Sequence, residues 1–287
     1  MQAIRSILVI LEANRTEDFA LKRAKLIAGV TQSHLHLLIC DRKQDHAARL
    51  DTLAAHLQQE GYSVSTEQFW QENPQQTIVS VQQAEGCGLV IKQHIPDNPL
   101  KKALLTPDDW KLLRYCPVPV LMVKSERPWT GGVILAAVDV GNHDNQHRTL
   151  HASIINHGFD IARLAHGELH VLSAHPSPML SAADPAFQLK DTIEARYREQ
   201  CKAFQNEYAI ADERLHIEEG PADVLIPYTA QKLQAVVTVI GTVARTGLSG
   251  ALIGNTAEVV LDNLESDVLV LKPDAIMAQL EDLVAQR

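Results

Sequence analysis

The segment of residues 241–258 concentrates residue types that can hold a phosphate. It contains four glycines, three threonines, one serine and one asparagine, and it lies between the apolar run 236–240 and a stretch with helical spacing. The first N–H groups of a helix are unpaired and carry a partial positive charge, and glycines let the backbone approach an anion closely. Asn255 or Thr256 can cap the helix or donate to a phosphate oxygen, and Arg245 can donate charged hydrogen bonds. The segment therefore predicts a phosphate cradle at the carboxyl end of a strand.

The same segment also fits two plainer interpretations. Glycines occur in strand-to-helix connections simply because the turn is tight, and Arg245 is equally well read as a solvated surface residue. The segment lacks the Gly-Lys-Ser/Thr of a P-loop and the G-x-G-x-x-G of a dinucleotide-binding turn. Its pattern alone leaves phosphate binding and a structural turn both open.

The other candidate chemical groups are few. His147 and His151 have the i, i+4 spacing that can chelate a metal, but no acidic residue completes a known motif, so we expect no metal site. His175 follows the run 169–174 and is interpreted as a satisfied buried histidine, with a ligand contact as the alternative. No paired carboxylates and no Ser-His-Asp order stand out, so the sequence predicts no catalytic residue.

The four cysteines are scattered. Cys40, Cys87, Cys116 and Cys201 form no C-x-x-C pair, which predicts neither a zinc site nor a redox pair. Reduced thiols in a cytosolic protein are expected. Cys116 is interpreted as a packing residue at the start of a strand, although Arg114 nearby leaves a reactive thiol open as an alternative.

Length and charge exclude several classes of protein. The 287 residues correspond to about two domains of ~150 residues. The net charge of −9 argues against sequence-independent nucleic-acid binding. No apolar run approaches the ~20 residues that span a bilayer, and the N-terminal run 7–11 is too short for a signal peptide. We therefore expect a cytoplasmic protein that binds neither nucleic acid nor membrane.

Apolar runs recur in the same order in both halves of the chain. The runs 7–11, 35–40, 88–91 and 119–124 match the runs 134–138, 169–174, 236–240 and 267–272. Stretches with helical spacing follow the first run of each half, around Phe19 and around Leu150. Continuous apolar strands that alternate with helices indicate a parallel sheet covered on both faces. The sequence therefore predicts two βαβαβαβαβ units of ~140 residues each.

The repeat places the domain boundaries. Residues 1–126 form a first domain and residues 131–273 a second, with a Pro- and Gly-containing linker between them, and residues 274–287 form a helical tail. The runs 120–123 and 268–271 are short and apolar, so they suit a pairing within the chain in which each covers the edge of the other. Such a chain is a pseudo-dimer, and a homodimer of it is a further possibility.

With the repeat in view, the chain resembles the universal stress protein family. Members that bind ATP carry Gly, two residues, Gly, nine residues, Gly and then Ser or Thr. Gly241 and Gly254 match the first and third glycines, Ala244 replaces the second, and Asn255 stands at the Ser/Thr position, followed by Thr256. The resemblance covers essentially the whole chain.

The first half resembles tandem members of the family but lacks the glycine loop. Its pattern T-P-x-D-W-x-L-L-R-x-C-P-x-P-V begins at Thr106, and no glycine lies between residues 92 and 110. Leu105 stands where the second half has Gly254, and Pro107 has no N–H to offer. Lys92 and His94 can pair with an anion, yet we expect a degenerate half that serves as a scaffold.

The resemblance implies a nucleotide-binding, Rossmann-like α/β fold with a five-stranded parallel sheet in each half. Asp139 corresponds to the acid that contacts the adenosine, with helix capping as the alternative role, and Ala174 corresponds to a position that packs on adenine. Glu12 replaces Asp139 in the first half and is read as a vestige or as a helix-capping acid. The candidate ligand-binding residues are Asp139, Ala174, Ile240, Gly241, Ala244, Arg245, Gly254, Asn255 and Thr256, and the candidate ligands are ATP, ADP and AMP.

Three functions remain, in this order. The first is a stress-response regulator that binds an adenine nucleotide or another small ligand through the second half. The second is a nucleotide-independent interaction scaffold or a binder of a different ligand, which the replacements Ala244 and Asn255 motivate. The third is a slow ATPase, which needs a base near the γ-phosphate, and only Asp139 and Glu258 are candidates for that base.

Overall fold

The computed structural model describes residues 1, 4–15, 18–95, 104–141, 145–177, 190–242 and 255–285. The first half contains β1 (Ser6–Leu11), α1 (Phe19–Thr31), β2 (His34–Ile39), α2 (Ala47–Gln59), β3 (Val64–Gln68), α3 (Pro74–Ala84), β4 (Leu89–Gln93), α4 (Pro107–Tyr115) and β5 (Val120–Val123). The second half contains β6 (Val133–Ala137), α5 (Asn145–Ala165), β7 (Glu168–His175), α6 (Lys190–Tyr208), β8 (Leu215–Glu219), α7 (Ala222–Lys232), β9 (Val237–Gly241), α8 (Asn255–Asn263) and β10 (Asp267–Leu271). A last helix, α9 (Asp274–Ala285), follows β10, so the predicted alternation and the predicted terminal helix are confirmed.

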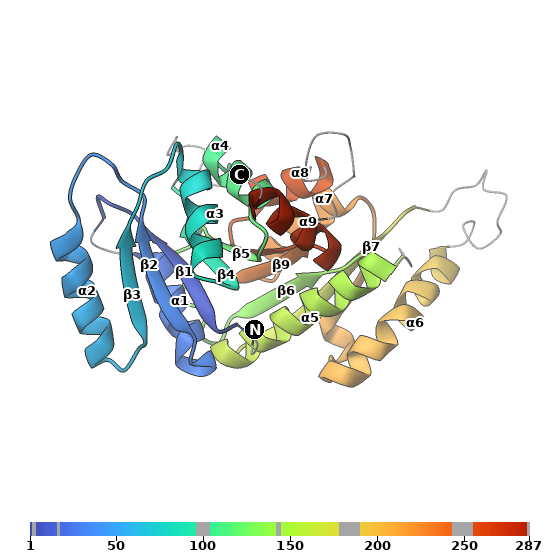
Figure 1. Ribbon diagram of the computed structural model, residues 1–287. Coiled ribbons are helices and arrows are strands. Elements are labelled where there is room, and N and C mark those ends of the chain that lie inside the picture. The colour runs from blue at the N-terminus through green and yellow to red at the C-terminus, as the bar shows by residue number, and fades with distance from the viewer. Residues whose placement is uncertain are drawn as a thin grey trace.

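The strands form one continuous sheet through both halves (Figure 1). Their order is β3-β2-β1-β4-β5-β10-β9-β6-β7-β8. Neighbouring strands are parallel within each half, whereas β5 and β10 pair antiparallel at the junction, with Leu121 opposite Leu269. These two strands lie in the runs that the sequence predicted would cover each other's edges.

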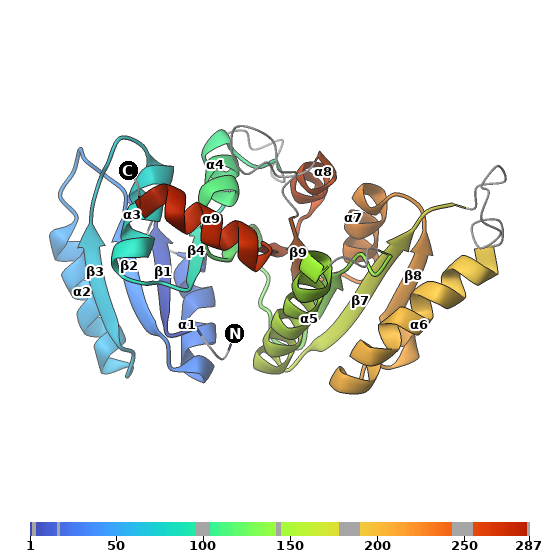
Figure 2. The same cartoon turned by 45° about the vertical axis from the view of Figure 1, so that its right-hand side comes forward.

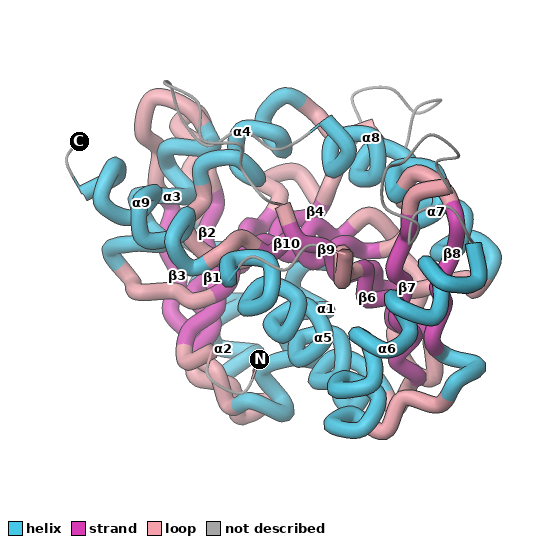
Figure 3. The backbone as a smooth tube through the Cα atoms, turned by 90° about the vertical axis from the view of Figure 1, so that its right-hand side faces the viewer, coloured by secondary structure: helices cyan, strands magenta, loops and turns pink. Residues whose placement is uncertain are grey.

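Helices cover both faces of the sheet (Figure 3). Helices α1, α2, α5 and α6 pack on one face, and α3, α4, α7 and α8 pack on the other. Side chains alternate between the faces along each strand, so Val9 joins the first layer and Leu8 the second. Both strand residues are fully buried, which explains the continuous apolar runs of the sequence.

The sequence patterns did not locate the third strand of each half. β3 (VSTEQ) and β8 (LHIEE) contain no continuous apolar run, and most of their residues are only partly buried. They are the two outer strands of the sheet. An outer strand needs less apolar surface than a central one, so its pattern is weak.

The C-terminal helix returns to the first half. Helix α9 crosses the layer of α3 and α4 and contacts α3 (Figure 2), and Gln83 Nε2 donates to the Glu281 carbonyl at 3.4 Å. The tail is therefore a further contact between the halves. In the described part of the chain, every helix is too short or too polar to cross a membrane.

Two lysines, Lys272 buried and Lys124 partly buried, tie the halves together symmetrically. Lys124, which follows β5, donates from Nζ to the Leu261 carbonyl at 2.7 Å, and Lys272, which follows β10, donates to the Cys116 carbonyl at 2.8 Å. Each carbonyl lies near the C-terminal end of the opposite half's last sheet-covering helix, where a cation is favourable. Burial lowers the pKa of both ammonium groups to about 8.

Candidate functional site

Three parallel strands of the second half end at the predicted ligand site. β6 lies between β9 and β7, so their carboxyl ends form one edge, the usual place for ligands in such sheets. Asp139 lies just beyond β6 and is exposed, and Ala174 is partly buried near the end of β7. Ile240 and Gly241 end β9, with Ile240 buried. The structure thus brings these four sequence-predicted residues to the same edge.

Gly241 has a packing reason to be glycine. A Cβ atom at this position would lie 2.6 Å from Leu150 Cδ2 and 3.0 Å from Ile154 Cδ1, so α5 crosses β9 closely here. Gly241 is not among the glycines with positive φ in the described residues. The close packing of α5 is therefore sufficient to explain why residue 241 is glycine.

The remaining predicted ligand residues lie in or beside the connection from β9 to α8. Ala244, Arg245 and Gly254 fall outside the described residues. Helix α8 already begins at Asn255, so Asn255 and Thr256 lie in its first turn and are not its N-cap, contrary to the capping role considered for them. The side chains of Asn255 and Thr256 are not described. The N-terminal N–H groups of a helix that follows β9 supply an anion-favouring end in this half.

Tyr197 lies close to Asp139, and its ring contacts His175. The Tyr197 hydroxyl from α6 lies directly over Gly141, where any side chain would collide with it. Burial, together with the charge of Asp139, raises the pKa of Tyr197. The His175 ring is centred 5.6 Å from the Tyr197 ring. The sequence analysis missed Tyr197, because only the fold carries α6 back over the end of β6.

His175 is a satisfied buried residue, as the sequence analysis favoured. It is 1% exposed, and its Nδ1 lies 3.0 Å from the Pro176 carbonyl, to which Nδ1–H donates. Asp139 is not the N-cap of α5, because that helix begins only at Asn145. Of the two roles considered for Asp139, capping α5 is therefore excluded.

The corresponding place in the first half is filled by its own charges. Lys92 Nζ lies 2.8 Å from Asp109 Oδ1, and His94 Nδ1 lies 2.7 Å from Asp109 Oδ2. Asp109 is fully buried in the first turn of α4, where it forms a capping box with Thr106. Burial opposes ionisation, but hydrogen bonds and charges of His94 and Lys92 hold the pKa of Asp109 below its usual range. Lys92 and His94 do pair with an anion, and that anion is a side chain of the protein.

Glu12 is not a capping residue. Asp18 caps α1 by accepting from the Leu21 N–H at 2.9 Å, and it also accepts from the Glu12 N–H at 3.3 Å. Burial raises the pKa of Glu12, and the Lys92 charge partly offsets this rise. Of the two interpretations of Glu12, helix capping is wrong for α1.

The cysteines are buried or nearly so. All four are free thiols, and Cys116 is completely buried, with a pKa that burial raises. Arg114 is engaged elsewhere, since its Nη2 lies 2.5 Å from Glu258 Oε1 across the junction of the halves. Cys116 is therefore a packing residue, as predicted.

Comparison with known proteins places this geometry in a family. The Universal stress protein family matches residues 39–124 and 132–272. Universal stress protein E of Escherichia coli K12 is 30% identical over 311 aligned positions, which cover 98% of both chains. The crystal structure of a functionally unknown protein from Pseudomonas aeruginosa PAO1 is 70% identical, with a TM-score of 0.92 over 100% of this chain and 99% of that one. A universal stress protein from Archaeoglobus fulgidus shares the fold at 15% identity, with a TM-score of 0.61 over 94% of this chain and 99% of that one.

Proposed function

The chain belongs to the universal stress protein family, and on that premise we propose that it is a cytoplasmic stress-response regulator that binds an adenine nucleotide through its second half. The contrast between the halves carries the proposal. In the first half, the buried carboxylate of Asp109 occupies the helix N-terminus and pairs with Lys92 and His94. In the second half, the acid at the end of the first strand, Asp139, is exposed to solvent.

The chemistry of the second half fits a nucleoside. An exposed carboxylate can accept hydrogen bonds from both hydroxyls of a ribose. The partly buried Ala174 and the ring of Tyr197 offer apolar surface beside that carboxylate, which suits a base. The N-terminus of α8 suits the phosphates. We propose binding without turnover, so that the ligand regulates the protein instead of being consumed.

Calorimetric titration of the purified protein with ATP, ADP and AMP tests the proposal. We expect one nucleotide per chain, because the first half is closed by its own ion network. Asp139→Asn removes the charge but keeps the shape, and it should weaken binding by roughly 10- to 100-fold, the value of one or two charged hydrogen bonds. Glu12→Gln, at the matching position of the first half, should leave the affinity unchanged. No response to any of the three nucleotides, or equal loss in both variants, would refute it.

A nucleotide-independent scaffold or binder of another ligand is the second candidate. Two observations favour it: Gly241 is explained by packing of α5, and Tyr197 lies over Gly141 beside Asp139. This alternative expects no thermal shift with nucleotide even when Tyr197→Ala clears the site. A slow ATPase would instead release phosphate in the wild type and not in Gly254→Trp.

A further inference from the structure

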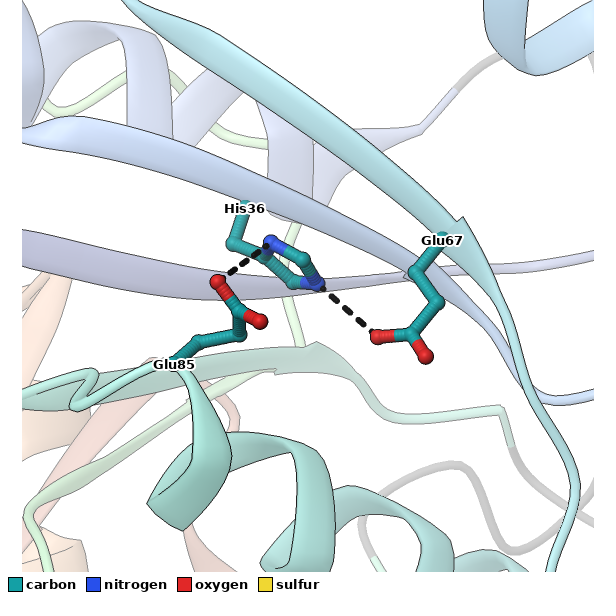
Figure 4. Close-up of side chains that lie close together, drawn as sticks. All are labelled: His36, Glu67 and Glu85. Atoms are coloured by element: carbon teal, nitrogen blue, oxygen red, sulfur yellow. Dashed lines mark hydrogen bonds and ion pairs between the residues drawn. The ribbon is translucent and has the colours of Figure 1, made fainter.

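A cluster of one imidazole and two carboxylates lies on the first half, away from the nucleotide edge. His36 of β2, Glu67 of β3 and Glu85, which directly follows α3, each place a ligand atom within 4.8 Å of the others (Figure 4). The His36 side chain is 5% exposed, whereas those of Glu67 and Glu85 are 37% and 44% exposed. We propose that this cluster binds a divalent transition-metal ion of the zinc type, for which imidazole and carboxylate are suitable ligands.

The distance between His36 and Glu67 fits the edge of a metal polyhedron. His36 Nε2 lies 3.3 Å from Glu67 Oε2, whereas the 3.6 Å distance to Glu85 Oε2 starts from Nδ1, the other ring nitrogen. Ligands that each lie ~2.0–2.2 Å from a tetrahedral ion are about 3.3–3.6 Å apart. A charged N–H···O bond is shorter, at about 2.7–2.9 Å. Because Glu85 is half exposed, its carboxylate can turn towards Nε2 and join Glu67 on one ion.

The two carboxylates of the cluster favour a cation between them. In the described part of the chain, neither Glu67 nor Glu85 pairs with a lysine or arginine, and His36 is the ion-pair partner of both. Two carboxylates that converge on one imidazole repel each other unless a positive charge lies between them. A divalent ion supplies that charge and leaves a fourth position for water, as in zinc sites with three protein ligands.

A hydrogen-bond chain behind His36 can orient it for metal binding. His36 Nδ1 and His34 Nε2 each lie 2.7 Å from Ser65 Oγ, and His34 Nδ1 lies 2.7 Å from Ser63 Oγ. When His36 Nδ1–H donates to Ser65, and Ser65 donates to His34, the Nε2 lone pair of His36 is free for the ion. Such outer contacts commonly fix the tautomer of a metal-bound histidine.

The second half provides an internal comparison. His170 and His216 stand at the positions of His36 and Glu67, because His216 pairs with Leu172 as Glu67 pairs with Leu38. The two rings stack with centroids 5.3 Å apart. Leu233 is the C-cap of α7, as Glu85 is of α3. The second half therefore lacks both carboxylates, and the site belongs to the first half.

Titration of the untagged, chelator-treated full chain with Zn²⁺ tests the site, with Co²⁺ absorption as a second readout of the ligand geometry. We expect one tight equivalent of metal and a rise in Tm on binding. Glu67→Gln and Glu85→Gln remove a charge at exposed positions and should each weaken binding at least tenfold. His216→Gln is the matched control and should leave the affinity unchanged.

Two results would overturn the metal site. One is the absence of both a heat of binding and a thermal shift with Zn²⁺. The contact between His36 and Glu67 would then be a hydrogen bond from Nε2–H to the carboxylate. The other is undiminished binding in the Glu67→Gln/Glu85→Gln double variant, which would move the metal to other histidines. Neither result bears on nucleotide binding, which involves the other half.

Discussion

Arg23 of α1 and Asp267 of β10 form a buried ion pair that joins the two halves of the chain, with Nε 2.8 Å from Oδ2. Asp267 also accepts from Trp129 Nε1 at 2.7 Å and from the N–H groups of Lys124 and Ser125 at 2.9 Å. Arg23 Nη2 donates to the Ser125 and Arg127 carbonyls. One ion pair therefore holds a helix of the first half, the last strand of the second half and the linker between them.

Removing one partner of this pair should destabilise the whole protein. Asp267→Asn keeps the size of the side chain but leaves the buried Arg23 charge without a counter-ion. Loss of one partner from a buried pair costs about 3–5 kcal/mol. We expect a correspondingly lower urea midpoint at neutral pH. The control is Lys25→Met, which breaks the partly exposed ion pair between Lys25 of α1 and Glu60 at the end of α2. An equal effect of the two variants would contradict the prediction.

Asp109 should make the stability of the protein sensitive to acid. Its pKa is lowered in the folded state, so the stabilisation is complete above the ordinary carboxyl pKa of about 4 and is lost progressively as the pH falls from there towards the lower pKa of the folded state. Asp109→Asn should cost about 3 kcal/mol or more at pH 7, because Lys92 loses its buried partner.

Urea unfolding of the wild type and Asp109→Asn between about pH 3 and 7 measures this effect. The difference in unfolding free energy between the wild type and Asp109→Asn should shrink towards acid pH, because protonation of Asp109 in the wild type removes the charge that the variant lacks. Asp108→Asn changes an exposed carboxylate of the same helix turn and should have little effect. A difference that stays constant with pH would show that the Asp109 charge is not responsible.

Lys272 should oppose folding at neutral pH. Its folded pKa is about 8 because of burial, against about 10.4 when unfolded, so the unfolded chain binds more protons between these values and stability rises with pH there. Lys272→Met should therefore be as stable as the wild type or more stable at pH 7. The excess in unfolding free energy of the variant over the wild type should be smaller at about pH 9.5. Unfolding free energies of the wild type and Lys272→Met at the two pH values test this prediction. Lys232→Met, at an exposed position, is the control. A stability excess of Lys272→Met that grows with pH would contradict the prediction.

The thiols should resist alkylation in the folded protein. Burial raises the pKa of Cys40 to about 12 and that of Cys201 to about 11, and it also raises those of Cys87 and Cys116. Because the thiolate is the reactive form, iodoacetamide at pH 8 should label the native protein slowly and the unfolded protein at four positions. Rapid labelling of a native thiol would identify a reactive cysteine that the structure does not explain.

Most of the fold followed from local pattern. Central strands such as β1 and β6 are buried on both faces, so their residues are continuously apolar and recognisable. The duplication was visible for the same reason, whereas the terminal helix α9 was predicted from the helical spacing of its apolar residues. The outer strands β3 and β8 were not, because a half-exposed strand imposes no strong pattern on its residues.

The sites show the other limit. Asp139 and Gly241 could be placed at strand ends from chain order, and the family resemblance suggested them as ligand residues. Tyr197 reaches the same edge only through the packing of α6. The same holds for Asp109, which fills the first half's site, and for His36, Glu67 and Glu85. Their charges meet because the sheet and its helices bring distant segments within a few ångströms. The sequence by itself determined the order and burial of the elements, and only the tertiary structure decided which charged side chains face one another.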